Sequence, residues 1–109
     1  MKSIYVIVGQ KFVPGADKII AQCKIGDPLV LVREPQNPHD PNAIGVWAGG
    51  MRIGYLLKKE NAELAALIDA KGIEPCGLAM DGIKGTAGLS ISGKFVVPGT
   101  KMPHVQVDI

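Results

Sequence analysis

The chain contains few aromatic residues, few cysteines and no long apolar run. Phe, Trp and Tyr make up 5% of its 109 residues, and its two cysteines are Cys23 and Cys76. Two cysteines this far apart, with two histidines at no finger-like spacing, lack the ligand pattern of a zinc site. Each apolar run is much shorter than the roughly 20 residues of a membrane-spanning helix, and residues 1–18 lack the apolar segment of a signal peptide. We therefore expect a cytoplasmic protein with free thiols, no membrane segment, no metal and no cofactor.

The chain also lacks a large excess of charge of either sign. Twelve Lys and Arg residues stand against 10 Asp and Glu, which gives a formal net charge of +2 at pH 7. The excess lies in residues 1–60, with eight basic against five acidic residues, whereas residues 61–109 carry four against five. This bias falls short of the dense basic runs of a nucleic-acid-binding tail, but it permits local contacts with phosphate groups.

Glycine and proline, in contrast, are abundant, with 14 and 8 residues, and 47% of the chain is apolar. This composition is typical of a globular domain with many turns. Apolar and β-branched runs predict short strands at residues 4–8 (continuing towards 13), 28–33, 43–48, 51–57, 73–80 and 86–97. Helical spacing of leucine and isoleucine predicts one helix over residues 58–70, stopped by Gly72, while residues 16–27 stay ambiguous. The pattern indicates a mainly β fold with one α-helix, a small β-barrel.

We divide the chain into a barrel domain, residues 1–97, and a C-terminal extension, residues 98–109. Within the extension, residues 104–109 alternate between apolar and polar side chains, as a short edge strand does. A free edge strand can add to the sheet of a neighbouring chain. The extension therefore offers a route to a homo-oligomer.

The most distinctive segment is EPQNPHDPN, residues 34–42. Its three prolines restrict the main chain, and its Asn and Asp side chains can accept hydrogen bonds from N–H groups two residues on, so we expect a rigid loop. Rigid polar loops between strands commonly carry binding residues. His39 and Asp40, at the tip, have no evident structural role. For Arg33, which precedes the loop, the alternative is a purely structural contact with Glu34 or Asp40.

The motif REPQNPHDPNAI, followed after a short gap by IGYL and an alanine- and leucine-rich helix, resembles the HIRAN domain family. Residues 8–12, VGQKF, are similar to the opening strand of that family, and the resemblance covers roughly residues 4–95. It implies an OB-like β-barrel with an inserted helix. It also implies a non-enzymatic module that binds the 3′-hydroxyl end of single-stranded DNA. Such domains usually occur fused to Swi/Snf-type ATPases that remodel stalled replication forks, so the resemblance implies a role in DNA repair or fork processing.

The resemblance further implies six nucleic-acid-binding residues: Lys11, Phe12, His39, Asp40, Tyr55 and Lys58. In the family pattern Lys11 lies near the phosphates and Phe12 stacks on a base. Asp40 accepts the hydrogen bond of the 3′-hydroxyl, and Tyr55 and Lys58 line the same groove, with Lys58 towards the backbone. Lys11 stands where an arginine is expected, and His39 stands where members often have a tyrosine.

Each of these assignments has a structural alternative. Phe12 could close the barrel core, Tyr55 could simply alternate outwards from its strand, and Lys58 could be a solvated residue at the start of the helix. We expect Trp47, the largest side chain, in the core.

The whole protein also has an alternative function. It could be a structural or protein-interaction module that keeps the fold without the DNA groove and forms oligomers through residues 98–109. Catalysis is disfavoured, because no Ser or Cys nucleophile accompanies His39 and Asp40.

Overall fold

Six antiparallel strands close into a barrel in the computed structural model, which describes residues 4–73, 89–97 and 102–107. Around the barrel the strands follow the order β1-β4-β3-β2-β5-β6. The elements in chain order are β1 (Ile4–Val8), the 3-10 turn η1 (Gln10–Phe12), α1 (Ala16–Gln22), β2 (Pro28–Arg33), β3 (Ile44–Ala48), β4 (Met51–Leu56), α2 (Ala62–Lys71), β5 (Ser90–Val97) and β6 (His104–Val107).

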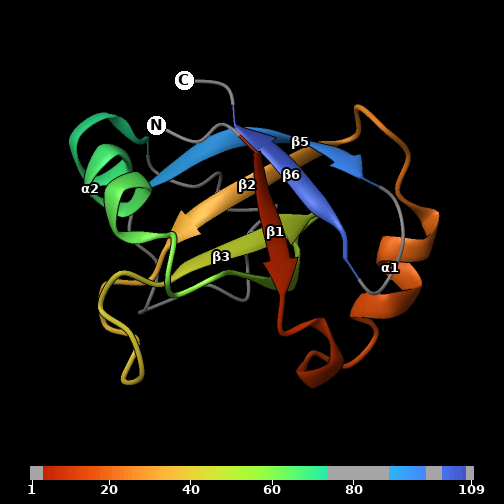
Figure 1. The fold of residues 1–109 in the computed structure, drawn as a ribbon. Helices are drawn as coiled ribbons and strands as arrows, with labels where there is room; N and C mark the ends of the chain where they lie inside the picture. The colour runs from red at the N-terminus through yellow and green to blue at the C-terminus, as the bar shows by residue number, and fades with distance from the viewer. Residues whose placement is uncertain (1–3, 74–88, 98–101, 108–109) are drawn as a thin grey trace.

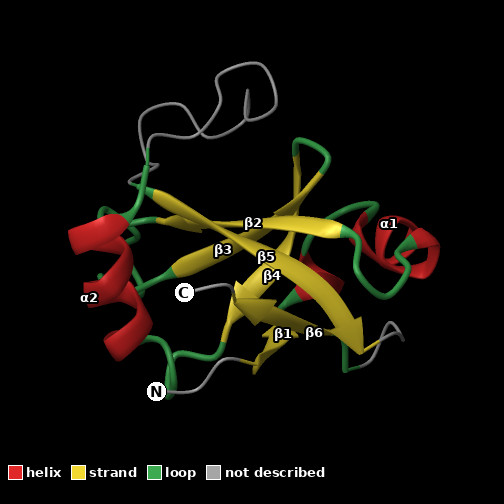
Figure 2. Cartoon of the chain, turned by 90° about the horizontal axis from the view of Figure 1, so that it is seen from above, coloured by secondary structure: helices red, strands yellow, loops and turns green. Residues whose placement is uncertain are grey.

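The core fills the inside of the barrel and extends beneath both helices. In β1, β5 and β6 buried residues alternate with more exposed ones, because successive side chains of a strand point to opposite faces, whereas β3 is buried along nearly its whole length. Figure 1 shows α2 on one side of the barrel and α1 on the other, and Figure 2 shows the same arrangement from above. The buried side chains from the strands and from α2 include Ile7, Leu31, Ile44, Val46, Ile53, Leu64, Ile68, Phe95 and Val105. The prediction of a mainly β, small OB-like barrel is confirmed.

Gly54 allows β1 and β4 to approach closely. A Cβ at this position would lie 2.6 Å from the main-chain oxygen of Val8 and 2.7 Å from Cγ2 of Ile7. Real Cβ atoms do not tolerate contacts this short, so any larger residue would push β1 away from β4. The glycine of the IGYL motif therefore has a packing role at the seam of the barrel.

The N-terminal region differs from the sequence prediction in two ways. The first strand ends at Val8 rather than continuing towards residue 13, because Gly9 adopts a left-handed conformation with φ +78° and turns the chain into η1. The core alternative for Phe12 is therefore wrong, since its side chain is 78% exposed. The ambiguous residues 16–27 contain a second helix, α1, which buries Ala16 and Ile20 against the barrel.

The long helix begins later than predicted. α2 starts at Ala62 instead of residue 58, because the preceding residues form a turn in which the N–H of Glu60 donates to the main-chain oxygen of Leu57. Lys58 and Lys59 consequently lie in that turn and not on the helix. No helix among the described residues is both long and apolar enough to cross a membrane.

β6 is not an edge strand. It pairs with β1 on one side and with β5 on the other, and so it closes the barrel. The edge-strand prediction is wrong for residues 104–107, because both of their hydrogen-bonding sides are used within the chain. The division of the chain at residue 97 stays a prediction.

The remaining expectations fall partly outside the described residues. Of the strand predicted at 73–80, only Ile73 is described, and it forms an isolated bridge with Ser90. Residues 86–88 of the next predicted strand, and Cys76, also lie outside. Trp47 is buried as expected, 6% exposed, but it packs with Val30 and Val32 in a small cluster of its own.

Candidate functional site

Arg33, the last residue of β2, anchors the proline-rich loop to α2. Its side chain is 4% exposed, and its Nε and Nη2 donate to the two carboxylate oxygens of Asp69 at 2.9 and 3.2 Å. Its Nη1 donates to the main-chain oxygen of Ala43 at 2.9 Å, and its Nη2 donates to that of Pro41 at 3.0 Å. One planar guanidinium thus fixes both the end of the loop and the last turns of the helix.

The structural role considered for Arg33 is confirmed, but the predicted partners are wrong. Its carboxylate partner is Asp69 on α2, and the carboxylates of Glu34 and Asp40 make other contacts. Asp69 lies 36 residues further along the chain, so no local pattern could have identified it.

Inside the loop, Asn37 and Asp40 form the turns that the sequence predicted. Oδ1 of Asn37 accepts hydrogen bonds from the main-chain N–H groups of His39 and Asp40, at 2.9 and 3.2 Å. Oδ1 of Asp40 accepts a hydrogen bond from the N–H of Asn42 at 2.9 Å, and its Oδ2 accepts one from Nδ2 of Asn61 at 2.8 Å. Asp40 therefore does have a structural role, contrary to expectation. Its carboxylate is fixed from both sides.

A pocket of about 440 Å³ lies between this loop, the end of β1, β4 and the turn before α2. This volume is within the range of small-ligand sites. The lining residues are Val8, Gly9, Asn37, His39, Asp40, Ala43, Tyr55, Leu56 and Lys58. Four of the six predicted binding residues are therefore brought together: His39, Asp40, Tyr55 and Lys58. Nζ of Lys58 also donates to the main-chain oxygen of His39 at 3.3 Å, which links the turn to the loop tip.

The Tyr55 hydroxyl is used inside the protein. It donates to Oε1 of Glu34 at 3.1 Å, and the same oxygen accepts a hydrogen bond from Nδ2 of Asn37 at 3.2 Å. The guanidinium of Arg52 lies 4.9 Å from the centre of the Tyr55 ring, with its Nη1 3.8 Å from Oε2 of Glu34. The hydroxyl proton is thus donated within the protein, which leaves the aromatic ring and the lone pairs of the hydroxyl oxygen for a ligand.

Glu34 was not predicted as a functional residue. It is 8% exposed, and its carboxylate positions both Tyr55 and the amide of Asn37 behind the pocket. Its place in the REPQNP motif was the only signal in the sequence. Gly45 leaves room for it, since a Cβ there would lie 2.8 Å from Oε2 of Glu34.

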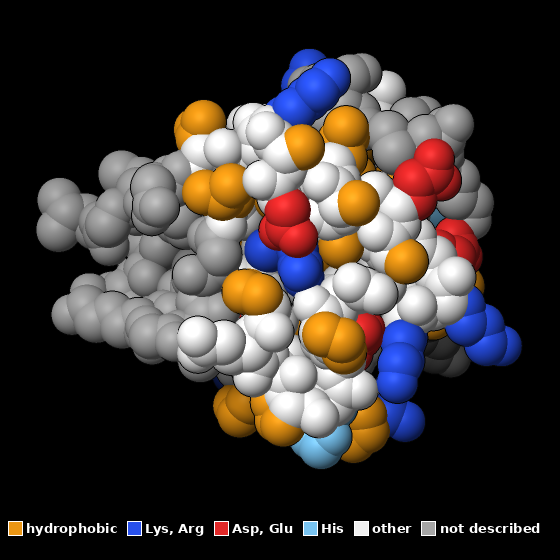
Figure 3. Space-filling view, turned by 90° about the vertical axis from the view of Figure 1, so that its left-hand side faces the viewer, with side chains coloured by type: hydrophobic (Ala, Val, Ile, Leu, Met, Phe, Trp, Pro, Cys, Tyr) orange, Lys and Arg blue, Asp and Glu red, His pale blue; other side chains and the backbone are white. Residues whose placement is uncertain are grey.

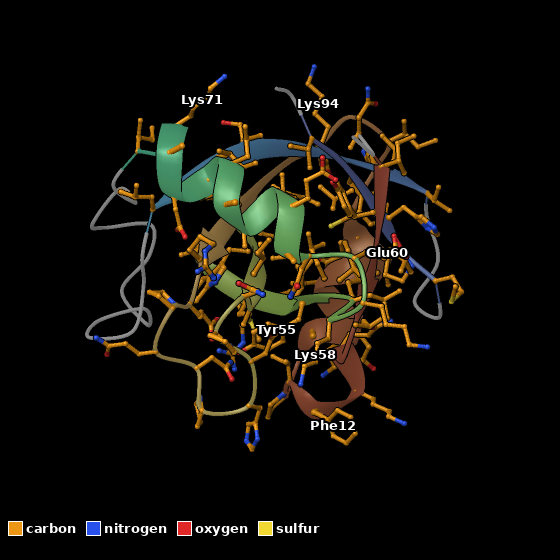
Figure 4. All side chains as sticks on the ribbon, turned by 60° about the vertical axis from the view of Figure 1, so that its left-hand side comes forward. Phe12, Tyr55, Lys58, Glu60, Lys71 and Lys94 are labelled. Atoms are coloured by element: carbon orange, nitrogen blue, oxygen red, sulfur yellow. The ribbon has the colours of Figure 1, made fainter. Side chains whose placement is uncertain are left out.

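Lys11 and Phe12 lie outside the pocket lining, on η1. This turn follows Gly9, a lining residue, and packs against β4. Nζ of Lys11 lies 5.1 Å from the centre of the exposed Phe12 ring. Figure 4 shows Tyr55, Lys58 and Phe12 towards one end of the molecule, whereas Lys71 and Lys94 lie at the opposite end. Lys11 and Phe12 are therefore neighbours of the pocket and do not line it.

On the face that carries α2, the basic side chains of the described residues do not form one continuous surface. Figure 3 shows its Lys and Arg side chains as separate groups among the described residues, with Asp and Glu between them.

The two tyrosines of the chain give a prediction for alkaline pH. Burial raises the pKa of Tyr55, and the negative charge of Glu34 raises it further against the smaller, opposite effect of Arg52. Burial and then the carboxylates of Glu63 and Glu60 raise the pKa of Tyr5. A pKa that is higher in the folded chain contributes stability below the unfolded value of about 10, and this stability is lost as the pH rises through the folded pKa.

We therefore expect tyrosinate absorbance to develop at higher pH in the folded protein than in the urea-unfolded protein, which titrates near pH 10. The free energy of unfolding, measured in urea at each pH, should fall over the same alkaline range. Coincident titration curves for folded and unfolded protein would contradict the effect of burial on the pKa values of the two tyrosines.

The chain is similar to one known family and to two solved structures. The model of a family described as "HIRAN domain" matches residues 2–98. A crystal structure of a protein from Lactobacillus plantarum is 20% identical with a TM-score of 0.74, over 96% of this chain and 88% of that one. The crystal structure of the HIRAN domain of human HLTF is 22% identical with a TM-score of 0.61, over 95% and 72%. At these identities the two structures show a shared fold. No curated protein sequence matches the chain.

Proposed function

Because this chain belongs to the HIRAN domain family, we propose that it is a non-enzymatic nucleic-acid-binding module whose pocket receives the 3′-hydroxyl end of a single DNA strand. The observation that carries the proposal is the convergence of His39, Asp40, Tyr55 and Lys58 on one pocket. They come from a rigid loop, a strand and a turn, and they combine a hydrogen-bond acceptor, aromatic surface and a cation.

Asp40 would recognise the terminal hydroxyl. An ionised carboxylate offers about four acceptor sites, and the structure uses one on Oδ1 and one on Oδ2 for protein donors. Two sites therefore remain for a ligand. A terminal hydroxyl can donate to them, whereas a terminal phosphate would bring negative charge against the carboxylate.

Lys58 would contact the phosphate backbone near the end. Its ammonium donates to a neutral main-chain oxygen, that of His39, so its positive charge stays available to an anion. Lys11, on the neighbouring turn, offers a second ammonium. Each phosphate contact releases a counterion and makes the affinity depend on salt.

Aromatic surface would hold the bases without regard to sequence. The Tyr55 ring lines the pocket, the Phe12 ring lies exposed beside it, and the imidazole of His39 is at the loop tip. Base stacking on such rings is worth about 1–3 kcal/mol per base and tolerates every base. With so few rings, the bound segment is only a few nucleotides long. Repair of DNA or processing of replication forks is the kind of process that such binding would serve.

Fluorescence anisotropy with two short, labelled single strands tests the proposal. We expect the strand with a 3′-hydroxyl to bind about tenfold more tightly than the same strand with a 3′-phosphate, since a hydrogen bond to a charged group is worth about 1.5–3 kcal/mol. Asp40→Ala should abolish the difference, whereas Lys58→Ala should weaken both strands and lower the salt slope by about one. Lys71→Ala, at the opposite end of the molecule, is the matched control. Equal binding of both strands, or no binding, would overturn the proposal.

The alternative, an interaction module that adds its C-terminal strand to a neighbouring chain, is not favoured. Residues 104–107 are already hydrogen bonded on both sides. Pairing with another chain would require the barrel to open.

A further inference from the structure

Asn61 occupies the N-cap position of α2 without capping the helix through its side chain. Asparagine is among the preferred N-cap residues, because its side-chain oxygen can accept a hydrogen bond from an N–H of the first turn. Here no such side-chain bond is formed, and only the main-chain oxygen accepts, from the N–H of Ala65 at 2.8 Å. The side chain is instead buried, 1% exposed, with its Nδ2 directed at Oδ2 of Asp40 at 2.8 Å.

This geometry does not serve the stability of the helix. Oδ1 of Asn61 is buried and finds no hydrogen-bond partner in the part of the chain that the structure describes. A buried acceptor without a partner is unfavourable, and so is the loss of a cap. The side chain thus leaves the helix uncapped and its own oxygen without a partner, and the one contact that it gains is the hydrogen bond to Asp40.

We propose that Asn61 is a positioning residue that holds Asp40 as a pure hydrogen-bond acceptor, so that the pocket selects a strand end that carries a hydrogen-bond donor. The inference rests on the proposed function. The N–H of Asn42 occupies Oδ1 of Asp40, and the amide N–H of Asn61 occupies Oδ2. With a protein donor already on each oxygen, the carboxylate presents its remaining lone pairs to a ligand as hydrogen-bond acceptors.

The anchorage of α2 supports this role. The helix is held near both of its ends. At its start Asn61 donates to Asp40 of the loop, and near its end Asp69 accepts from Arg33, the β2 residue that anchors the loop. Because α2 is fixed at these two points, the hydrogen bond from Asn61 holds the carboxylate of Asp40, and so its acceptor lone pairs, in one orientation. A hydroxyl is therefore selected because it donates a hydrogen bond to Asp40.

The first test varies the ligand and leaves the protein unchanged. Four strands of one sequence, ending in 3′-hydroxyl, 3′-amino, 3′-methoxy and 3′-phosphate, are compared by anisotropy. The hydroxyl and amino ends should bind within about threefold of each other, and the methoxy and phosphate ends about tenfold more weakly. A methoxy strand that binds as tightly as the hydroxyl strand would overturn the inference while leaving end binding itself intact.

The second test varies Asn61. Asn61→Ser keeps a good N-cap residue but is too short to reach Asp40, and Asn61→Asp keeps the shape but replaces the donor with an acceptor. Both should reduce the preference for hydroxyl over phosphate by at least fivefold, and Asn61→Ser, which adds no charge, should leave the affinity for the phosphate strand within about twofold. Thermal unfolding should show that Asn61→Ser is folded, as its capping ability predicts.

Asn42→Ala is the matched control for the second test, because it removes an exposed side chain and keeps the main-chain N–H that contacts Asp40. Unchanged discrimination in folded Asn61→Ser or Asn61→Asp protein would overturn the inference. If the wild-type protein does not distinguish hydroxyl from phosphate at all, the proposed function fails, and the inference fails with it.

Discussion

Replacing Arg33 with alanine is expected to lower the free energy of unfolding by about 3–5 kcal/mol. The substitution removes two hydrogen bonds from a buried charged group to main-chain oxygens, those of Pro41 and Ala43, together with the pair to Asp69. Hydrogen bonds from charged groups contribute about 1.5–3 kcal/mol each. The loss should appear in urea unfolding as a lower midpoint with an unchanged slope.

A matched control is Asp69→Asn, which keeps an acceptor for Arg33 but removes the charge. Asp69 is 54% exposed, and exposed pairs are worth about 0–1 kcal/mol, so this variant should stay within about 1 kcal/mol of the wild type. The difference between the two variants isolates the bonds from Arg33 to the loop. If Arg33→Ala costs no more than Asp69→Asn, the guanidinium does not hold the loop.

The strands and the proline-rich loop could be predicted because their signals are local. β-branched runs, glycine turns and three prolines within nine residues act on neighbouring parts of the chain. The helix α1 gave a weaker signal, since it has only seven residues, of which two are fully buried. The exposure of Phe12 depends on the left-handed turn at Gly9, which the sequence permits but does not require.

The contacts that position the pocket residues could not be predicted, because they join residues that are far apart in the sequence. Asp40 and Asn61 are 21 residues apart, and Arg33 and Asp69 are 36 apart, so the barrel alone brings them together. A single sequence contains no pattern that joins such pairs. The motif that resembles the HIRAN family could indicate His39, Asp40, Tyr55 and Lys58, but not the residues that fix them in place. The sequence therefore indicated four residues that line the pocket and missed those that orient them.

The double variant Phe12→Ala/Tyr55→Ala should weaken binding of single-stranded DNA by about 2–6 kcal/mol, because each ring removed costs about 1–3 kcal/mol of stacking. The two rings differ in what else they do. Phe12 is 78% exposed and its removal should leave stability unchanged, whereas Tyr55 also holds the hydrogen bond to Glu34. Anisotropy on the single and double variants, with urea unfolding of each, separates the two contributions.

Tyr55→Phe is the control that decides what the Tyr55 ring contributes. It keeps the ring and loses only the bond to the Glu34 carboxylate, so stability should fall by about 1.5–3 kcal/mol while the affinity for DNA is retained. The loss in Tyr55→Ala would then belong to the aromatic surface. If Tyr55→Phe loses as much affinity as Tyr55→Ala, the hydroxyl rather than the ring serves the ligand. In that case the hydroxyl oxygen accepts a hydrogen bond from the DNA while its proton remains in the hydrogen bond to Glu34, or the bond to Glu34 opens when DNA binds.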